Sequence, residues 1–595
     1  GAAAALFWTA AARLALAPPP SGAVTVPLGR WLEAGGIDVT FALRLDALSA
    51  AMGLVVTGVG FLIHLYAVAL MRGEEGLRRF YAAMNLFVAA MLLLALADDY
   101  LVLYLGWEGV GLCSYLLIGF WHRDPANGRA ARKAFVVTRA GDAALLLGLL
   151  LIFSRLGTLR IDEVAARAGA AWQPGSAVAI AAAALLLAGA LGKSAQLPLQ
   201  TWLPDAMAGP VPVSALIHAA TMVTAGVYLV ARSRALFALA PAVLHAAAAI
   251  GAATLLLAAC SALVQRDVKR ALAYSTMSQI GYLYLALGVG APAAAIFHLV
   301  THAFFKALLF LGAGVAIVAA GGTHDLAAMG GLRRRLPLVF WCFGAGTASL
   351  AALPFVTAGF WSKEGILAAA WSSPWAGGWL WAAGVAGALL TALYAFRILA
   401  LVFFGEPRAA FNGADAQSVA TGPAMTIPLV VLALASIGGA LLALPPPGAT
   451  GSAFVTFLAP VLGGESGGAA EVSPLLRPVA VLASLGGAWL AYLFFRPGRA
   501  GAATTGAPAA AGPLHRLLVA GWGFDWLYER LFVRPLLWAA DAGRDDPADL
   551  PFRGLAWYVL LADGMLSRAQ SGRMRWYAAG IALGAAAALA LVLLA

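Results

Sequence analysis

Charged side chains are scarce in this sequence. Asp, Glu, Lys and Arg make up 11% of the 595 residues and apolar residues make up 62%, whereas charged residues are about 25% of a soluble globular protein. A soluble fold is therefore excluded. The formal net charge of +11 does not indicate a nucleic-acid-binding protein, because the only basic cluster is 333–335 and apolar runs dominate the chain.

Cysteine is also rare. The three cysteines, Cys113, Cys260 and Cys342, lie far apart in apolar stretches without a CxxC pair or a Cys/His spacing. They are predicted to be buried hydrophobic side chains rather than disulfides or metal ligands. The sequence lacks a glycine-rich phosphate loop, a nucleophile elbow, a His-Glu zinc motif and a haem-attachment motif. These absences give no support to a metal or cofactor site in this chain.

Lysine is the scarcest basic residue, because only five of the 38 Lys and Arg residues are lysine. Three of the five, Lys193, Lys306 and Lys363, lie within apolar runs. Arginine keeps its proton at accessible pH, whereas a buried lysine can lose one. Lysine at these places therefore favours reversible protonation. A steric reason is the alternative, since arginine is bulkier in a tight bundle.

Long apolar runs predict an all-α protein that crosses the membrane many times. A membrane-spanning helix needs about 20 mostly apolar residues, and about fifteen segments meet that requirement. Two of them, 177–207 and 337–372, are too long for one span. Pro198 and Pro204 interrupt the first and Pro354 the second, so both are predicted to be broken helices. The predicted spans are 1–17, 46–70, 80–97, 99–121, 134–154, 177–207, 211–231, 242–264, 270–290, 292–320, 337–372, 379–404, 424–444, 477–495 and 576–595.

The loops between these spans alternate in positive charge. One set of loops holds 14 Lys or Arg residues and the intervening set holds 6. By the positive-inside rule, the first set is predicted to face the cytoplasm. The basic loops are 71–79, 122–133, 265–270, 321–336 and 405–423, and the others are 18–41, 97–99, 155–176, 232–241, 373–378 and 445–476.

Segment 522–575 departs from the pattern of spans. It holds 14 charges, seven of each sign, and its apolar residues recur at three- and four-residue steps. This pattern predicts an amphipathic helix that lies along the cytoplasmic membrane surface, before 576–595 returns as a C-terminal anchor. An ordinary loop with a short helix is the alternative, because Pro535, Pro547 and Pro551 interrupt the segment.

Seven ionisable residues lie at membrane depth, where such groups are costly and mark a pathway or a paired structural charge. Three of them, His298, His302 and Lys306, recur at four-residue steps and so share one helix face, about 6 Å apart. This line favours proton hopping over metal binding, because a cationic lysine is a poor ligand. Satisfied polar groups that fix helix packing are the alternative. The candidates are Glu108, Lys193, His218, His298, His302, Lys306 and Lys363.

Glu108 is predicted to be the partner of Lys193. Close pairing keeps the ammonium charged, and withdrawal of the glutamate favours release of its proton, so the two groups form a switch. Asp142 lies three residues after Arg139. These two residues either join the same network or form a local ion pair.

Several of these segments resemble the largest antiporter-like membrane subunit of respiratory complex I, the proton-translocating NADH:quinone oxidoreductase. The similarity covers nearly the whole chain and includes GWEGVGLCSY (106–115), GKSAQLPLQTWLPDAM (192–207) and DVKRALAYSTMSQIGY (267–282). It implies two inverted five-helix repeats with broken helices, a long lateral helix and a last membrane anchor. It also implies one more helix before 1–17, so a further N-terminal segment is expected.

The resemblance implies that the essential charged residues are Glu108, Lys193, His302, Lys306 and Lys363, with His218 and His298 as bridging positions. It implies no redox cofactor in this chain, with FMN, iron–sulfur clusters and quinone in partner subunits. The expected regions are N-terminal transmembrane helices 1–75, a first repeat 80–235, a second repeat 240–405, additional helices 420–500, the lateral helix 522–575 and the anchor 576–595.

These features predict a proton-translocating subunit of a bacterial cytoplasmic membrane. Protons are expected to enter from the cytoplasm at Lys193 and to leave outward from Lys363, driven by redox chemistry in other subunits. The expected partners are the other membrane-arm and redox subunits, the lipid bilayer and protons, but no nucleic acid. Two alternatives are the large subunit of a multisubunit Na⁺/H⁺ antiporter with the same core and a non-conducting scaffold.

Overall fold

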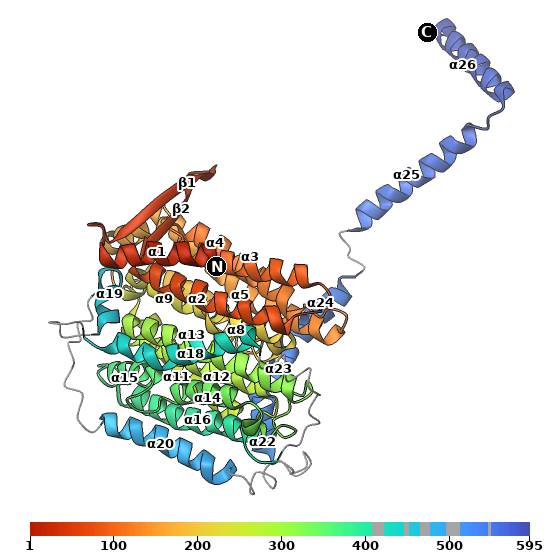
Figure 1. Cartoon of the computed structure of the whole chain (residues 1–595). Coiled ribbons are helices and arrows are strands. Elements are labelled where there is room, and N and C mark those ends of the chain that lie inside the picture. The colour runs from red at the N-terminus through yellow and green to blue at the C-terminus, as the bar shows by residue number, and fades with distance from the viewer. Residues whose placement is uncertain are drawn as a thin grey trace. The chain divides into compact units, whose positions relative to one another are not determined.

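Eleven helices among the described residues are long and apolar enough to cross a membrane. The computed structural model describes residues 1–375, 377–406, 422–445, 452–463, 476–495, 512–544 and 549–594. Residues 1–522 and 523–595 form separate units. The prediction of an all-α, many-span membrane protein is confirmed, apart from one β-hairpin in the first unit (Figure 1).

Every apolar segment predicted to span the membrane contains a helix. The helices in the first part of the chain are α1 (Ala2–Leu16), α2 (Ala47–Leu70), α3 (Leu77–Leu96), α4 (Tyr100–Ile118), α5 (Pro125–Leu156), α7 (Ala177–Lys193), α8 (Val211–Ala219) and α9 (Met222–Arg232). The helices that follow are α11 (Pro241–Val264), α12 (Val268–Gly288), α13 (Pro292–Ala319), α14 (Pro337–Leu350), α15 (Ala358–Trp371), α16 (Gly377–Phe403), α18 (Pro423–Gly438), α20 (Leu476–Phe495) and α26 (Met574–Leu594). Shorter helices between them are α6 (Ile161–Ala171), α10 (Arg234–Ala238), α19 (Ala453–Leu462) and α22 (Pro513–Val519).

Helix α13 lies in the middle of the first unit, where it contacts α2, α8, α12, α14, α15 and α18. In its most apolar 18-residue stretch, 83% of the residues are buried within the protein, so it is shielded from lipid on nearly all sides. Helices α11 and α12 pack closely side by side. A Cβ atom at Gly251 of α11 would lie 2.6 Å from the carbonyl oxygen of Gly281 of α12, so this contact requires glycine. The core is thus built around the helix that carries the predicted line of titratable residues.

The two predicted broken helices are broken. Helix α7 ends at Lys193, and the chain then continues through Pro198 and Pro204 without a long helix until α8 begins. Helices α14 and α15 are separated by a non-helical segment that contains Pro354. The hydroxyl of Thr357 accepts a hydrogen bond from the backbone N–H of Phe360 at 3.3 Å and so caps the second piece.

A third break separates α8 from α9, within segment 211–231 that the sequence predicts as one continuous span. The hydroxyl of Thr221 donates a hydrogen bond to the carbonyl oxygen of Leu216 at 2.7 Å. A threonine that bonds to the preceding turn competes with the backbone ladder and bends or ends a helix. The break follows directly after His218, so it places that side chain beside an irregular stretch of backbone.

Segment 18–41, predicted as a loop, forms most of an antiparallel hairpin of β1 (Ala23–Ala34) and β2 (Ile37–Asp46). Ala34 pairs with Ile37, so the turn consists of Gly35 and Gly36 alone. Both glycines have positive φ, at 58° and 84°, which matches the tight turns that connect hairpin strands. Apolar length alone does not distinguish this Gly-Gly turn from an ordinary loop.

The end of β2 is tied to α9 by a buried ion pair. The guanidinium of Arg232 donates to both carboxylate oxygens of Asp46, at 2.5 and 2.9 Å, and also to the hydroxyl of Tyr228. Burial alone favours the neutral acid, but the charge of Arg232 outweighs it and holds the pKa of Asp46 well below its ordinary value. Asp46 also caps α2 through the N–H of Ser49 at 3.0 Å. One carboxylate therefore joins the hairpin, α2 and α9.

Replacing Arg232 with alanine is expected to destabilise the protein by up to roughly 3–5 kcal/mol, because the buried carboxylate of Asp46 loses the guanidinium that binds both of its oxygens and keeps only Arg44, whose Nε lies 3.0 Å from Oδ2. The thermal unfolding midpoint of the purified protein measures this effect. The matched control is Arg30→Ala, because the Arg30–Glu33 ion pair lies at the surface and such pairs contribute about 0–1 kcal/mol. Equal midpoints for the two variants would contradict the proposed role of the Asp46–Arg232 pair.

The described parts of the two predicted loop sets gather into two groups. On the basic side, Arg123 forms an ion pair with Glu75 at 2.9 Å. On the same side, the backbone of Asp267 pairs with that of Asp325 in an isolated antiparallel β-bridge. On the other side, the N–H of Tyr100 donates to the carbonyl oxygen of Leu159 at 2.9 Å, and that of Gly175 donates to Leu239 at 2.8 Å. Alternate loops therefore meet, as consecutive spans require. Most of the predicted loops 405–423 and 445–476 lies outside the described residues.

The second unit contains α23 (Phe524–Tyr528), a π-helical turn (Glu529–Val533), α24 (Arg534–Ala542), α25 (Leu550–Ala569) and α26. The prediction of one long helix over 522–575 is wrong, because α25 ends at Ala569 and α24 ends at Ala542. Pro535 and Pro551 lie in the first turns of α24 and α25. A proline is tolerated there because a backbone N–H in the first turn has no acceptor within the helix. Pro547 lies outside the described residues.

Candidate functional site

The predicted site residues lie on six helices of the first unit. Helix α4 carries Glu108, α5 carries Arg139 and Asp142, α7 ends at Lys193, and α8 carries His218. Helix α13 carries His298, His302 and Lys306, and α15 carries Lys363. The three lysines and three histidines at membrane depth are at most 2% exposed. The structure thus places them in the protein interior and away from lipid.

Lys193 forms a buried ion pair with Asp142. Its Nζ donates to Oδ2 of Asp142 at 2.9 Å, and both side chains are at most 2% exposed. The indole N–H of Trp107 donates to the other carboxylate oxygen at 2.6 Å. A Cβ atom at Gly111 would lie 2.8 Å from Nζ of Lys193, so this glycine leaves room for the ammonium.

Glu108 instead pairs with Arg139, whose guanidinium lies 2.7 Å from the carboxylate. The predicted Glu108–Lys193 pair is therefore not formed, and Asp142 does not pair with Arg139. The reason is helical phase: Trp107 and Gly111 are four residues apart on α4 and share the face toward Lys193. Glu108 is rotated by about 100° from Trp107 on that helix, so it meets a different part of α5.

The predicted line on α13 is formed. The rings of His298 and His302 lie 6.3 Å apart between centroids, and Nδ1 of His298 lies 2.8 Å from the hydroxyl of Ser362 on α15. Lys306 donates to the hydroxyl of Ser275 and, at 3.4 Å, to the carbonyl oxygen of Leu272 on α12. No carboxylate among the described residues pairs with Lys306. Its only hydrogen-bond partners there are neutral oxygens.

Lys363 has a neutral partner as well. Its Nζ donates to the carbonyl oxygen of Leu350 at 2.6 Å, and Leu350 is the last residue of α14. Carbonyl groups at a helix C-terminus lack intrahelical partners and carry partial negative charge. The helix break therefore creates the acceptor that binds the ammonium. Lys363 also lies 5.3 Å from the ring centroid of Tyr282, and that ring lies 6.3 Å from His298.

His218 and His302 have no hydrogen-bond partner at either ring nitrogen within the described part of the protein. The ring of His218 packs on Phe310 of α13 at 4.9 Å between centroids. It therefore stands between the α7–α8 region and the α13 line. Buried polar groups normally have partners, so these ring nitrogens are suited to hold water.

Helix α12 contributes residues to the surroundings of Lys193, Lys306 and Lys363. None of these α12 residues is among the candidates predicted from the sequence. Ser275 contacts Lys306, Tyr282 faces Lys363, and Tyr284 donates to the hydroxyl of Ser194, the neighbour of Lys193, at 3.0 Å. Twelve of the sixteen residues in 267–282 are polar or small, which is unusual in a membrane span. That excess of serine, threonine and tyrosine was the available signal.

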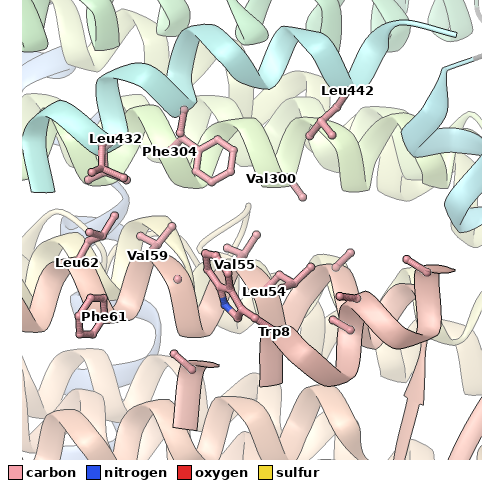
Figure 2. Close-up of a pocket in the computed structure, with 18 of the residues that line it drawn as sticks. Trp8, Leu54, Val55, Val59, Phe61, Leu62, Val300, Phe304, Leu432 and Leu442 are labelled. Atoms are coloured by element: carbon pink, nitrogen blue, oxygen red, sulfur yellow. The ribbon is translucent and has the colours of Figure 1, made fainter. Parts of the chain in front are cut away.

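A large apolar cavity lies apart from the candidate residues. It has a volume of about 1010 Å³ and lies between α1 and α2 on one side and α13, α18 and α19 on the other (Figure 2). Apolar side chains line it, among them Trp8, Val59, Phe304 and Leu432, and it contains none of the candidate residues.

A smaller cavity of about 570 Å³ opens among the basic loops and is lined largely by polar and charged residues. Asp205 lies on its wall and binds Lys133 at 2.5 Å and Arg270 at 2.9 Å. Lys269, almost fully buried, donates to the carbonyl oxygen of Gly209 at 2.8 Å. The described residues contain no group of three His, Cys, Asp or Glu side chains arranged to hold a metal ion.

Two family models match the chain. One, described as NADH:quinone oxidoreductase/Mrp antiporter, TM, matches residues 97–391, and the other, described as NADH-Ubiquinone oxidoreductase (complex I), chain 5 N-terminus, matches residues 31–81. NADH-quinone oxidoreductase subunit L of Pseudomonas aeruginosa is 49% identical over 579 residues, which cover 97% of this chain and 91% of that protein. The Escherichia coli subunit L is 50% identical over 572 residues, which cover 95% and 89%.

Solved structures share the fold. The Mrp complex from Dietzia sp. contains a chain that matches with a TM-score of 0.71 and 30% identity, covering 95% of this chain and 60% of that one. An archaeal membrane-bound sulfane sulfur reductase matches with a TM-score of 0.64 at 23% identity, covering 82% of this chain and 92% of that one. The second likeness shows the fold alone.

Proposed function

Because the chain belongs to the NADH-quinone oxidoreductase subunit L family, we propose that it translocates protons across a membrane as a subunit of such an enzyme. The relatives that match this chain over nearly their whole length are named as subunits of NADH-quinone oxidoreductase. The observation that carries the proposal is the line of buried titratable groups from Lys193 to Lys363. Two of its lysines, Lys306 and Lys363, have only neutral hydrogen-bond partners among the described residues.

The proposed route begins at Lys193, which binds a proton while Asp142 stabilises its charge. The proton then passes by His218 to the α13 line and on to Lys363, from which it leaves. Several gaps, such as the 6.3 Å between the rings of His298 and His302, are longer than a hydrogen bond, so water is the carrier between these groups. The Glu108–Arg139 pair lies beside the entry residue and is the proposed second element of the switch.

The proposed direction is from the cytoplasm to the outside of a bacterial cytoplasmic membrane. The gathering of the described basic loops supports this orientation under the positive-inside rule. The second unit is proposed to lie on the cytoplasmic side up to α25. Redox chemistry in partner subunits, which would hold FMN, iron–sulfur clusters and quinone, is proposed to drive the transfer by shifting the pairs at Glu108 and Lys193.

A second candidate is the large subunit of a multisubunit Na⁺/H⁺ antiporter, favoured by the fold match to the Mrp complex. Purification of the native assembly from membranes separates the two. We expect flavin and iron–sulfur subunits to co-purify in fixed ratio, and NADH to drive proton uptake into proteoliposomes. Co-purification with small membrane proteins alone, together with sodium-dependent proton exchange, would contradict the proposal. A non-conducting scaffold predicts normal proton transport after the buried lysines are neutralised.

A further inference from the structure

The cavity of about 570 Å³ among the basic loops carries a surplus of positive charge. Four basic and two acidic residues line it, which gives its wall a formal net charge of +2 when the imidazole of His324 is neutral. The charged residues are Arg129, Lys133, Asp205, Asp267, Lys269 and Arg270. A concave wall with one prevailing sign of charge concentrates ions of the opposite sign. The cavity therefore favours an anion over a metal ion.

Both carboxylates on the wall already have partners within the protein. Asp205 binds Lys133 through one oxygen, at 2.5 Å, and Arg270 through the other, at 2.9 Å. Asp267 accepts a hydrogen bond from the backbone N–H of Arg270 at 3.0 Å, and its carboxylate lies 3.6 Å from Nδ1 of His324. The acidic groups are thus occupied, and the surplus charge belongs to the basic side chains.

Two guanidinium groups retain N–H donors for a ligand. The side chain of Arg129 is exposed on the cavity wall, and no described residue forms an ion pair or hydrogen bond with it. Arg270 uses Nη1 for Asp205, which leaves its other side-chain N–H groups for a ligand. A guanidinium presents a planar fork of donors that matches the oxygens of a phosphate group.

The wall joins parts of the chain that are far apart in sequence. Arg129 and Lys133 lie one turn apart near the start of α5. Asp205 lies in the break between α7 and α8, and Arg270 lies in the first turn of α12. A ligand bound by both guanidinium groups therefore connects α5 to α12 beside the break that follows Lys193.

The rim of the cavity has the composition of a membrane–water interface. Trp121 lies on the wall, is 40% exposed and follows three residues after the end of α4. Tryptophan is enriched where membrane-spanning helices reach the lipid headgroups. Basic pockets between such helices bind the phosphate groups of anionic lipids. The position of the cavity thus gives it access to lipid headgroups as well as to the aqueous phase.

We propose that this cavity binds a phosphate group through Arg129 and Arg270, supplied by the headgroup of an anionic phospholipid or by free phosphate. The bound group offsets the surplus positive charge and braces α5 against α12. This binding is separate from the proposed proton route, because none of the residues on that route lines the cavity.

The test measures how fast a cysteine introduced by Ala126→Cys reacts with a maleimide in the purified, delipidated complex. Ala126 is exposed and lines the cavity, so a bound ligand shields the new thiol. Three additions are compared: phosphatidylglycerol, phosphatidylcholine and inorganic phosphate. The modified peptide is quantified by mass spectrometry. We expect phosphatidylglycerol or inorganic phosphate to slow the modification and phosphatidylcholine to have little effect.

Arg129→Gln, added to Ala126→Cys, is expected to raise the ligand concentration that gives half-protection about tenfold or more, because a charge-assisted hydrogen bond is lost. The matched control is Arg132→Gln, because Arg132 is exposed on the same helix but does not line the cavity. Its half-protection concentration should stay unchanged.

Protection by phosphatidylglycerol alone identifies a lipid headgroup as the source, and protection by inorganic phosphate identifies free phosphate. The proposal is refuted if neither addition protects the thiol, if phosphatidylcholine protects it equally, or if Arg129→Gln and Arg132→Gln behave alike. The reaction rate does not depend on proton transport, so failure of this proposal leaves the proposed function intact.

Discussion

Replacing Lys306 with methionine is expected to stop proton translocation through this subunit without lowering its thermal stability. Methionine fills nearly the same volume but cannot bind a proton. Lys306 has only neutral partners among the described residues, so its charged form is buried without compensation. The hydroxyl of Ser275 remains bonded to the carbonyl oxygen of Leu272 at 2.7 Å when the lysine is absent. The variant therefore loses a costly charge and leaves no new unpaired group.

Proton uptake per NADH oxidised and the thermal unfolding midpoint, both on the purified complex, measure these two effects. Loss of a group that transfers protons slows such steps by about 10²–10⁴-fold, so the share of proton uptake that depends on this subunit should vanish. The thermal unfolding midpoint of the Lys306→Met complex is expected to equal or exceed that of the unaltered complex. A lower midpoint would show that Lys306 stabilises the fold, and normal uptake would show that it carries no protons.

The same substitution at Lys193 is expected to have a different effect on stability. Lys193→Met leaves the buried carboxylate of Asp142 without its counter-charge, at a cost of roughly 3–5 kcal/mol. The double variant Lys193→Met/Asp142→Asn removes both charges and keeps an oxygen that accepts the indole N–H of Trp107. We expect the double variant to recover most of the unfolding midpoint but none of the proton translocation.

The thermal unfolding midpoints of the two single variants and the double variant form a double-mutant cycle that measures the coupling between Lys193 and Asp142. The companion cycle, with Glu108→Gln in place of Asp142→Asn, is the matched control. Glu108 pairs with Arg139 and not with Lys193, so the second cycle should show little coupling. A larger coupling for Glu108 than for Asp142 would contradict the ion pairs described for this structure.

The sequence predicts the helices and the burial of the candidate lysines and histidines, but not which charged residues pair with one another. Spans and broken helices follow from apolar length and from prolines such as Pro198 and Pro354, which act locally. Which carboxylate meets Lys193 depends on the rotation of α4 against α7, and that rotation is set by packing at Trp107 and Gly111. The sequence places Glu108 and Asp142 near the site, but the prediction that Glu108 pairs with Lys193 is wrong, because Asp142 takes that place.

Three further features escaped prediction for related reasons. Apolar length alone does not predict the hairpin, although Gly35 and Gly36 mark its turn. The break after His218 depends on one hydrogen bond from Thr221, and a threonine alone does not distinguish a bend from a regular helix. The polar face of α12 becomes meaningful only when Ser275, Tyr282 and Tyr284 are seen beside three different lysine sites.

The central claim is that buried lysines bind and release protons. Lys193→Arg tests it most directly, because arginine keeps a positive charge beside Asp142 but does not release its proton at accessible pH. The decisive measurement is the number of protons taken up per NADH oxidised by this variant complex in proteoliposomes. The account predicts that this number falls as far as it does in Lys193→Met. A number equal to that of the unaltered complex would show that Lys193 contributes a fixed charge and not a mobile proton.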